Sequence, residues 1–290
     1  MCGFTVRRNG MRTSHKHIFW LGLWLAGLIV LLVWDAFFLN GPAFTLLVHA
    51  FGGSLLTGLL AVLFSVVLGW LVGVLLYFCE TRTQVLYLCL AFLLNVIRSI
   101  PQIVGILIGY IILTVLIEQE ILGSAASQLV YVALTIAVFV FLEIVDLVRE
   151  RIAYYNKLDF VQAMLCCGIS EGRIINREIL WKNSRAHLLH KMISIFGVAI
   201  FLQCSIDFII SVGLSTDVSL SNFPPTLGSL LAKLDSKQDI LAIGTVFSDP
   251  MNLRALLFEH VQGLSIAFLI VFTLICVYRI SNALVKRYAL

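Results

Sequence analysis

Residues 52–79 read GGSLLTGLLAVLFSVVLGWLVGVLLYFC and contain no charged side chain. A helix needs about 20 apolar residues in a row to cross the hydrocarbon core of a bilayer, and this run exceeds that length. Its apolar residues do not alternate with polar ones at a period of two, as they would in a barrel strand. The stretch therefore predicts a transmembrane helix. Gly69 and Gly73 form a GxxxG pair on this helix, which we expect to permit close packing within the chain rather than a dimer seam.

The composition extends this reading to the whole chain of 290 residues. Hydrophobic residues make up 60% of the chain and charged residues 12%, and the mean hydropathy is +1.01. Soluble domains have roughly 45–50% apolar and about 25% charged residues. The fold class we predict is all-α, a polytopic membrane protein with about six transmembrane helices. The other five apolar segments are 18–39, 86–117, 127–148, 191–214 and 261–283.

Basic residues divide unevenly between the two sides of these segments. Sixteen Lys and Arg residues lie before the first segment, around 80–85, between 149 and 191, or at the C-terminal end from Arg279 onward, whereas the segment 215–260 has three. The positive-inside rule then places both termini and the loop 149–190 in the cytoplasm. It makes 1–17 a cytoplasmic N-terminal segment and 215–260 extracytoplasmic. The first span, 18–39, is expected to stay uncleaved, because its apolar run is long for a signal peptide and no small-x-small site follows it.

One cytoplasmic stretch has a definite pattern of its own: residues 159–183 read DFVQAMLCCGISEGRIINREILWKN. Asp159 favours a helix N-terminus by its charge, and Gly168 then breaks the run. In the second half, Ile174, Ile175, Ile179 and Leu180 can share one face, with the charged side chains outside it. We therefore predict two short helices that meet at a glycine, in a shape that a soluble partner can bind.

The same stretch resembles the EAA loop of ABC importer permeases, whose pattern is approximately D-Y-V-x-A-A-x-x-x-G-x-S-x-x-x-I-I-x-x-x-I-L-P. Gln162 stands where that family has an acidic residue, Met164 where it has a second alanine, and Trp181 where it has proline. The resemblance implies the type I permease fold and makes the loop the site that couples to the ATPase. The residues it assigns to this coupling loop are Asp159, Val161, Gln162, Ala163, Gly168, Ser170, Ile174, Ile175, Ile179 and Leu180.

Two weaker similarities point to the dipeptide and oligopeptide permeases within this family. They lie in the second span and in SVGLSTDVSLSNFPPTLGSLLA (211–232), so that the resemblance covers about residues 45–285, the predicted permease domain. The G-T-D-x-x-G-R-D motif of those permeases is missing before the second span. A peptide importer is favoured on this basis. A permease for amino acids, nickel or metal chelates is the alternative, and an ion-driven secondary transporter is a weaker one.

The resemblance also implies the assembly around this chain. A second homologous permease subunit, two cytoplasmic ATPase subunits and an extracytoplasmic solute-binding protein would complete an importer in a bacterial cytoplasmic membrane. The chain has no GxxxxGK[ST] phosphate loop, so ATP and Mg would bind the partner ATPases, and we expect this chain to bind no cofactor or metal itself. It has no HExxH motif, and we expect no enzyme activity of its own; its small net charge of +4 gives no reason to expect nucleic-acid binding.

Ionisable residues within apolar segments are costly and are often functional. Asp35, Glu143, Asp146 and Asp207 lie in or near predicted spans. We expect Glu143 and Asp146 to form interfacial ion pairs, whereas Asp207 lies deeper and could belong to a buried structural pair or to the translocation path.

The third segment contains the motif NVIRSIPQIVG, with Arg98 and Pro101. Arg98 could pair with one of the acidic residues or face a water-filled pathway. Pro101 predicts a kink or break that shapes the cavity. The third segment is the one that we expect to be interrupted. Arg98, Pro101 and Asp207 are thus the candidates for a translocation path or gate.

Overall fold

The computed structural model describes residues 16–213, 224–233, 244–246, 248–252 and 261–288. These residues are helical apart from short connections, and none of them forms a strand. The first elements are α2 (Lys16–Phe38), α3 (Gly41–Arg82), α4 (Gln84–Ser99), α5 (Gln102–Glu118), α6 (Ala125–Val140) and α7 (Leu142–Tyr155). They are followed by α8 (Asp159–Cys166), α9 (Glu171–Arg173), the π-helix η1 (Ile174–Asn183), α10 (Arg185–Gly213), α11 (Leu227–Lys233), the 3₁₀-helix η3 (Pro250–Asn252) and α14 (Val261–Tyr288).

Among the described residues, four helices are long and apolar enough to cross a membrane. They cover Ile18–Phe38, Gly41–Arg82, Arg185–Ile210 and Gly263–Leu284. Two further pairs, α4 with α5 and α6 with α7, pass the same test when each bent pair is taken as one span, which raises the number to six. The all-α prediction is confirmed, and four to six spans agree with a multi-pass membrane protein.

Both bent pairs depart from a continuous span. The pair α4–α5 turns by 91° at Ile100 and Pro101, which confirms the break expected at the proline. The pair α6–α7 also bends, by 45° at Phe141, so the expectation that the third segment alone is interrupted was wrong. No proline marks this second bend. Ile144 N instead donates to Phe141 O three residues back, a tighter turn than the regular helix has.

Helix α3 is the longest element and begins well before the apolar run that predicted it. Pro42 occupies its first turn, where the missing backbone N–H leaves no hydrogen bond unmade. The residues from Ala43 onward are mostly apolar and continue the helix into residue 52 without a break. Its 42 residues correspond to a length of about 63 Å.

The two glycines of the GxxxG pair lie at the contact between α3 and α7. A Cβ on Gly69 would lie 2.5 Å from Ile144 Cβ, and one on Gly73 would lie 2.8 Å from a methyl of Val148. Any side chain at these positions would collide with α7. The prediction of close packing within the chain is confirmed.

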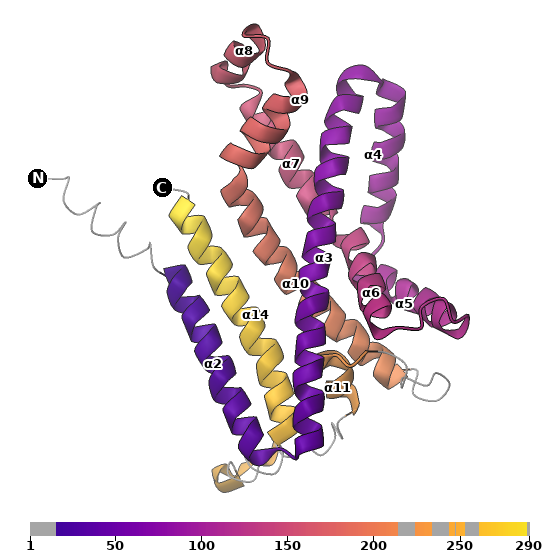
Figure 1. Cartoon of the computed structure of the whole chain (residues 1–290), viewed down its shortest axis with the longest axis vertical. Coiled ribbons are helices and arrows are strands. Elements are labelled where there is room, and N and C mark those ends of the chain that lie inside the picture. The colour runs from indigo at the N-terminus through magenta and orange to yellow at the C-terminus, as the bar shows by residue number, and fades with distance from the viewer. Residues whose placement is uncertain (1–15, 214–223, 234–243, 247, 253–260, 289–290) are drawn as a thin grey trace, which may run out of the picture.

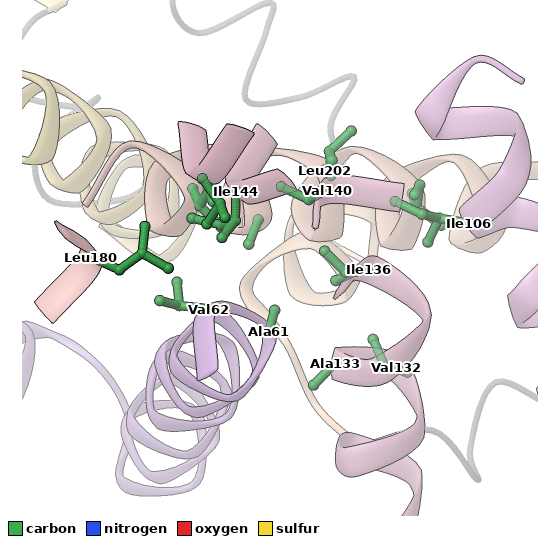
Figure 2. Close-up of a cluster of buried hydrophobic side chains, with 14 of the residues drawn as sticks. Ala61, Val62, Ile106, Val132, Ala133, Ile136, Val140, Ile144, Leu180 and Leu202 are labelled. Atoms are coloured by element: carbon green, nitrogen blue, oxygen red, sulfur yellow. The ribbon is translucent and has the colours of Figure 1, made fainter. Parts of the chain in front are cut away.

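Figure 1 shows α2, α14, α10 and α3 running lengthwise through the molecule, with α8 and the α3–α4 turn at one end and α11 toward the other. Helix α2 packs mainly on α14, and α14 packs on α10. Helix α3 contacts α6, α7 and α10. The largest group of buried apolar side chains joins α3, α5, α6, α7 and α10 with the 159–183 stretch, and Figure 2 shows part of it, with Leu180 of η1 and Val62 of α3 both labelled.

The described part of the segment 215–260 near α11 packs on the membrane-spanning helices. Leu227 N donates to Ser54 Oγ of α3 at 3.0 Å, and the Pro225 carbonyl lies 2.9 Å from the position of a Cβ on Gly53. Gly228 lies against the backbone of Cys204 in α10, where a Cβ would come within 2.5 Å of the Cys204 carbonyl oxygen. The turn before α11 therefore bridges α3 and α10. Residues 215–223, 234–243, 247 and 253–260 of the predicted extracytoplasmic segment, and residues 1–15 of the N-terminal segment, lie outside the described residues.

Candidate functional site

The 159–183 stretch folds as two helices joined at a glycine. The first is α8, and Gly168 follows it with φ of 78°, a left-handed conformation that glycine adopts at little cost. Gly168 N donates to Leu165 O at 2.9 Å, and Ile169 N donates to Met164 O at 3.2 Å. This pair of bonds is the Schellman motif that ends many helices. The predicted glycine joint is confirmed.

The second half of the stretch is a π-helix in most of its length. Its hydrogen bonds link residues five apart, so side chains at a spacing of five lie above one another. Ile174 and Ile179 form one such pair, and Ile175 and Leu180 form another. All four side chains are at most 3% exposed. The prediction that they share a face is confirmed, and burying each contributes about 1.5–3 kcal/mol.

The candidate coupling residues divide between two faces of the element. Val161, Ile174, Ile175, Ile179 and Leu180 point inward and belong to the main core of the protein. The other five are exposed, and they are Asp159, Gln162, Ala163, Gly168 and Ser170. The inward set holds the element in place, and the outward set is available for contact with another molecule.

The exposed residues of α8 and its C-terminal end include the apolar Phe160, Ala163 and Leu165 and the cysteines Cys166 and Cys167, beside the polar Asp159 and Gln162. Phe160 is 37% exposed and Leu165 is 41% exposed. Asp159 in the first turn of α8 supplies the only acidic charge of that helix, where it complements the helix dipole.

Two aromatic side chains of α3 hold this element. Trp70 Nε1 donates to Asn176 Oδ1 at 2.8 Å, and Tyr77 OH donates to Glu171 Oε1 at 2.6 Å. Asn156, between α7 and α8, donates in turn to Tyr77 OH at 3.2 Å. Polar bonds from Asn156, just before the stretch, and from Glu171 and Asn176 within it therefore converge on one part of α3. Hydrogen bonds to a charged group contribute about 1.5–3 kcal/mol, so the Tyr77 bond is a strong restraint.

The element also leads directly into α10. The π-helix ends at Asn183, Ser184 forms the cap, and α10 begins at Arg185. Tyr155 of α7 donates to the Asn183 carbonyl at 3.3 Å, and Lys191 of α10 forms an ion pair with Glu143 of α7 at 2.9 Å. The joint between η1 and α10 is thus braced by α7.

Arg98 and Pro101 lie at the bend between α4 and α5. Arg98 donates from one guanidinium nitrogen to both carboxylate oxygens of Asp146 in α7, at 2.7 and 2.9 Å. Both side chains are more than half exposed. Arg98 therefore forms the ion pair that was one of its two expected roles, and Glu143 and Asp146 are both paired, with Lys191 and Arg98.

Asp207 lies apart from these residues, buried in α10. Tyr110 of α5 donates to one of its carboxylate oxygens at 2.6 Å, and Thr226 donates to the other at 2.6 Å. The carboxylate thus joins α10, α5 and the turn before α11. Its contacts are those of a buried structural group. Arg98, Pro101 and Asp207 line neither the groove between α2 and α14 nor the groove between α10 and α14.

Several features of the site were missed by the sequence reasoning. The anchoring role of Trp70 and Tyr77 depends on contacts between segments about 100 residues apart, which no local pattern reveals. The π-helix was also missed, although the spacing of five between Ile174 and Ile179 and between Ile175 and Leu180 was a usable signal. Among the described residues, no three His, Cys, Asp or Glu side chains gather where they could hold a metal ion.

The chain has no match among protein-family models and no significant match among curated proteins. The resemblance to ABC importer permeases therefore stays a prediction from the sequence pattern of residues 159–180.

Proposed function

We propose that this chain is a transmembrane permease subunit of an ATP-driven importer, and that the element formed by α8, α9 and η1 is where an ATPase subunit docks. One observation carries the proposal. The ten residues that the family pattern singles out separate into an inward apolar face and an outward exposed face, with the glycine joint between the two short helices. A loop that served only to connect two spans would not need this glycine joint.

Motion of the docked element has a direct route into the membrane-spanning helices. The π-helix continues through Ser184 into α10, and α10 carries Asp207, which binds the turn before α11 at the far end. Closure of an ATPase dimer would displace α8 and η1, and packed helices would pass that displacement on as a rigid-body tilt. The chain would thereby alternate between two orientations of α10 relative to α5.

The proposed cargo is a peptide. This part of the proposal depends on the similarity around Pro225, Gly228, Leu230 and Leu231. In the structure these residues form the turn and helix that bridge α3 and α10, with Leu227 and Leu230 buried. An element that packs on both helices is well placed to follow their relative motion. The further assembly that we propose comprises a second homologous permease, two ATPases and a solute-binding protein in a bacterial cytoplasmic membrane.

The exposed cysteines of α8 provide a direct test. Inverted membrane vesicles from cells that produce the tagged full-length chain are treated with a short bismaleimide, and the chain is then purified under denaturing conditions. We expect Cys166 or Cys167 to crosslink to a nucleotide-binding protein, detected by photolabelling with azido-ATP. The matched control is the variant Cys166→Ser/Cys167→Ser, which keeps the exposed Cys89 of α4 and should lose the crosslink.

A second measurement fixes the side of the membrane. A membrane-impermeant maleimide should label Cys166 and Cys167 in inverted vesicles and leave them unlabelled in intact cells. Labelling from the outside, or the absence of any nucleotide-binding partner in the crosslinked material, would refute the proposed docking role.

A further inference from the structure

Helix α4 packs against the rest of the molecule along one side and is exposed along the other. None of its residues is fully buried. Figure 1 shows it at the edge of the molecule, beside α3. The side chains that pack on α3 and α7 are Tyr87, Leu90, Leu94 and Ile97.

The exposed side of α4 carries a row of residues spaced alternately three and four apart. The row consists of Val85, Leu88, Phe92, Asn95 and Ser99. Residues with this spacing lie on one stripe of a helix, and the same spacing forms the seam between two helices of a coiled coil. Val85 is 76% exposed and Phe92 is 71% exposed, so the stripe is an open surface.

An amide distinguishes this row from the exposed rows of the neighbouring helices. From Ile103 to Val115, every exposed side chain of α5 is apolar. The exposed row along the middle of α3 is also wholly apolar and consists of Leu56, Leu59, Leu63, Val67, Leu71 and Leu75. Such rows suit contact with lipid. On α4, by contrast, the Asn95 side chain is exposed and has no hydrogen-bond partner within the described part of the chain.

Neither lipid nor water suits the α4 row as a whole. Helices α4 and α5 together form a candidate span, and Asn95 lies well inside it. In hydrocarbon the amide of Asn95 would have no hydrogen-bond partner, which is costly. In water, large apolar side chains such as Phe92 would stay exposed. A second helix that offers both apolar side chains and an amide meets both requirements.

The row is complementary to itself. A primary amide has two N–H donors and one carbonyl acceptor, so two Asn95 side chains can donate to each other. The one charged side chain of α4, Arg98, is neutralised by Asp146 of the same chain, so two such faces would not repel each other. Two copies inserted in the same orientation are related by a twofold axis along the membrane normal, which brings identical residues to the same level.

From the row and its amide we propose that two copies of this chain pair through the exposed side of α4, with a hydrogen bond between the two Asn95 side chains. Amide side chains join membrane helices in this way, and a single asparagine in an apolar seam fixes the register of the pair. The pairing stands apart from the proposed transport function, because it depends only on the surface of α4.

Disulfide crosslinking of the full-length chain in native membranes tests the geometry. In the starting variant, serine replaces Cys2 and the exposed cysteines Cys89, Cys166 and Cys167. Single cysteines are then introduced as Phe92→Cys, in the row, and Leu93→Cys, which is exposed beside it. Two copies with different tags are produced in the same cells and treated with copper phenanthroline.

We expect Phe92→Cys to give a dimer that carries both tags and Leu93→Cys to give little or none, because the two Cβ atoms of a disulfide must lie within about 4.5 Å. Equal yields from the two positions would indicate random collision. That result, or a crosslinked product that never carries both tags, would overturn the proposal.

The role of the amide is tested by energy transfer between donor-labelled and acceptor-labelled copies of the full-length chain in lipid vesicles. Asn95→Leu should weaken the association about 3–30-fold, the range expected for a hydrogen bond between membrane helices. Asn95→Gln keeps the amide and is the matched control, with a clearly smaller loss. If Asn95→Leu associates as the wild-type chain does, or if the wild-type copies show no energy transfer, the proposal is wrong.

Discussion

The glycine joint of the 159–183 element yields the sharpest prediction. At position 168 a Cβ would meet no atom within 4 Å, so a substitution there introduces no collision. The penalty is purely conformational, because φ of 78° is unfavourable for residues with a side chain. For most L-residues it amounts to roughly 1–2 kcal/mol. Asparagine tolerates this conformation better than other non-glycine residues, and a β-branched residue such as valine tolerates it poorly.

A penalty of roughly 1–2 kcal/mol raises the population of the opened joint about 5–30-fold. In Gly168→Val, hydrogen exchange of the Ile169 amide, which donates to Met164 O in the closed joint, should therefore accelerate by that factor. Gly168→Asn is the matched control and should show a clearly smaller effect. Amides in the middle of α10 should exchange as in the wild-type chain. Unchanged exchange in Gly168→Val, or equal effects of valine and asparagine, would refute the reasoning about the left-handed joint.

Three further substitutions test the packing around this element and around Asp207. Gly69→Leu should lower the thermal unfolding temperature in detergent, because overpacking typically costs about 1–3 kcal/mol. The control is Gly52→Leu on the same helix, which meets open space and should leave the temperature unchanged. Equal shifts in the two variants would contradict the α3–α7 contact. Tyr77→Phe removes the bond to Glu171, worth about 1.5–3 kcal/mol, and should speed amide exchange over residues 171–176, while the exposed Tyr154→Phe serves as control. Asp207→Ala should lower the unfolding temperature more than Asp207→Asn, because alanine leaves the Thr226 hydroxyl without its acceptor. Identical temperatures for the two variants would contradict this account of the Thr226 bond.

The helical membrane character of the chain could be predicted from the sequence because it depends on local properties. Apolar runs and the absence of two-residue alternation are visible in any window of about 20 residues. The glycine joint was equally readable, since a helix end needs a left-handed residue at a fixed place and Gly168 stands there. The bend at Pro101 follows from the missing backbone donor of proline.

What escaped prediction depends on contacts between distant segments. The bend at Phe141 has no proline or glycine of its own, and it occurs where α7 meets Gly69 of α3. The pairing of Arg98 with Asp146 was one of two open alternatives, because the sequence gives no distance between α4 and α7. Asp207 presented the same difficulty: its two hydroxyl partners come from a helix about 100 residues earlier and from a turn 19 residues later.

Helix α3 is uninterrupted from Gly41 to Arg82, and it forms hydrogen bonds to different parts of the chain toward its two ends. Ser54 accepts the hydrogen bond from Leu227, and Tyr77 donates one to Glu171. Ser54 and Tyr77 are therefore about 35 Å apart along the axis of one helix. A straight helix resists bending and stretching over that distance. The turn before α11 and the element around Glu171 are therefore expected to move in concert, and a change of position imposed on one should be detectable at the other.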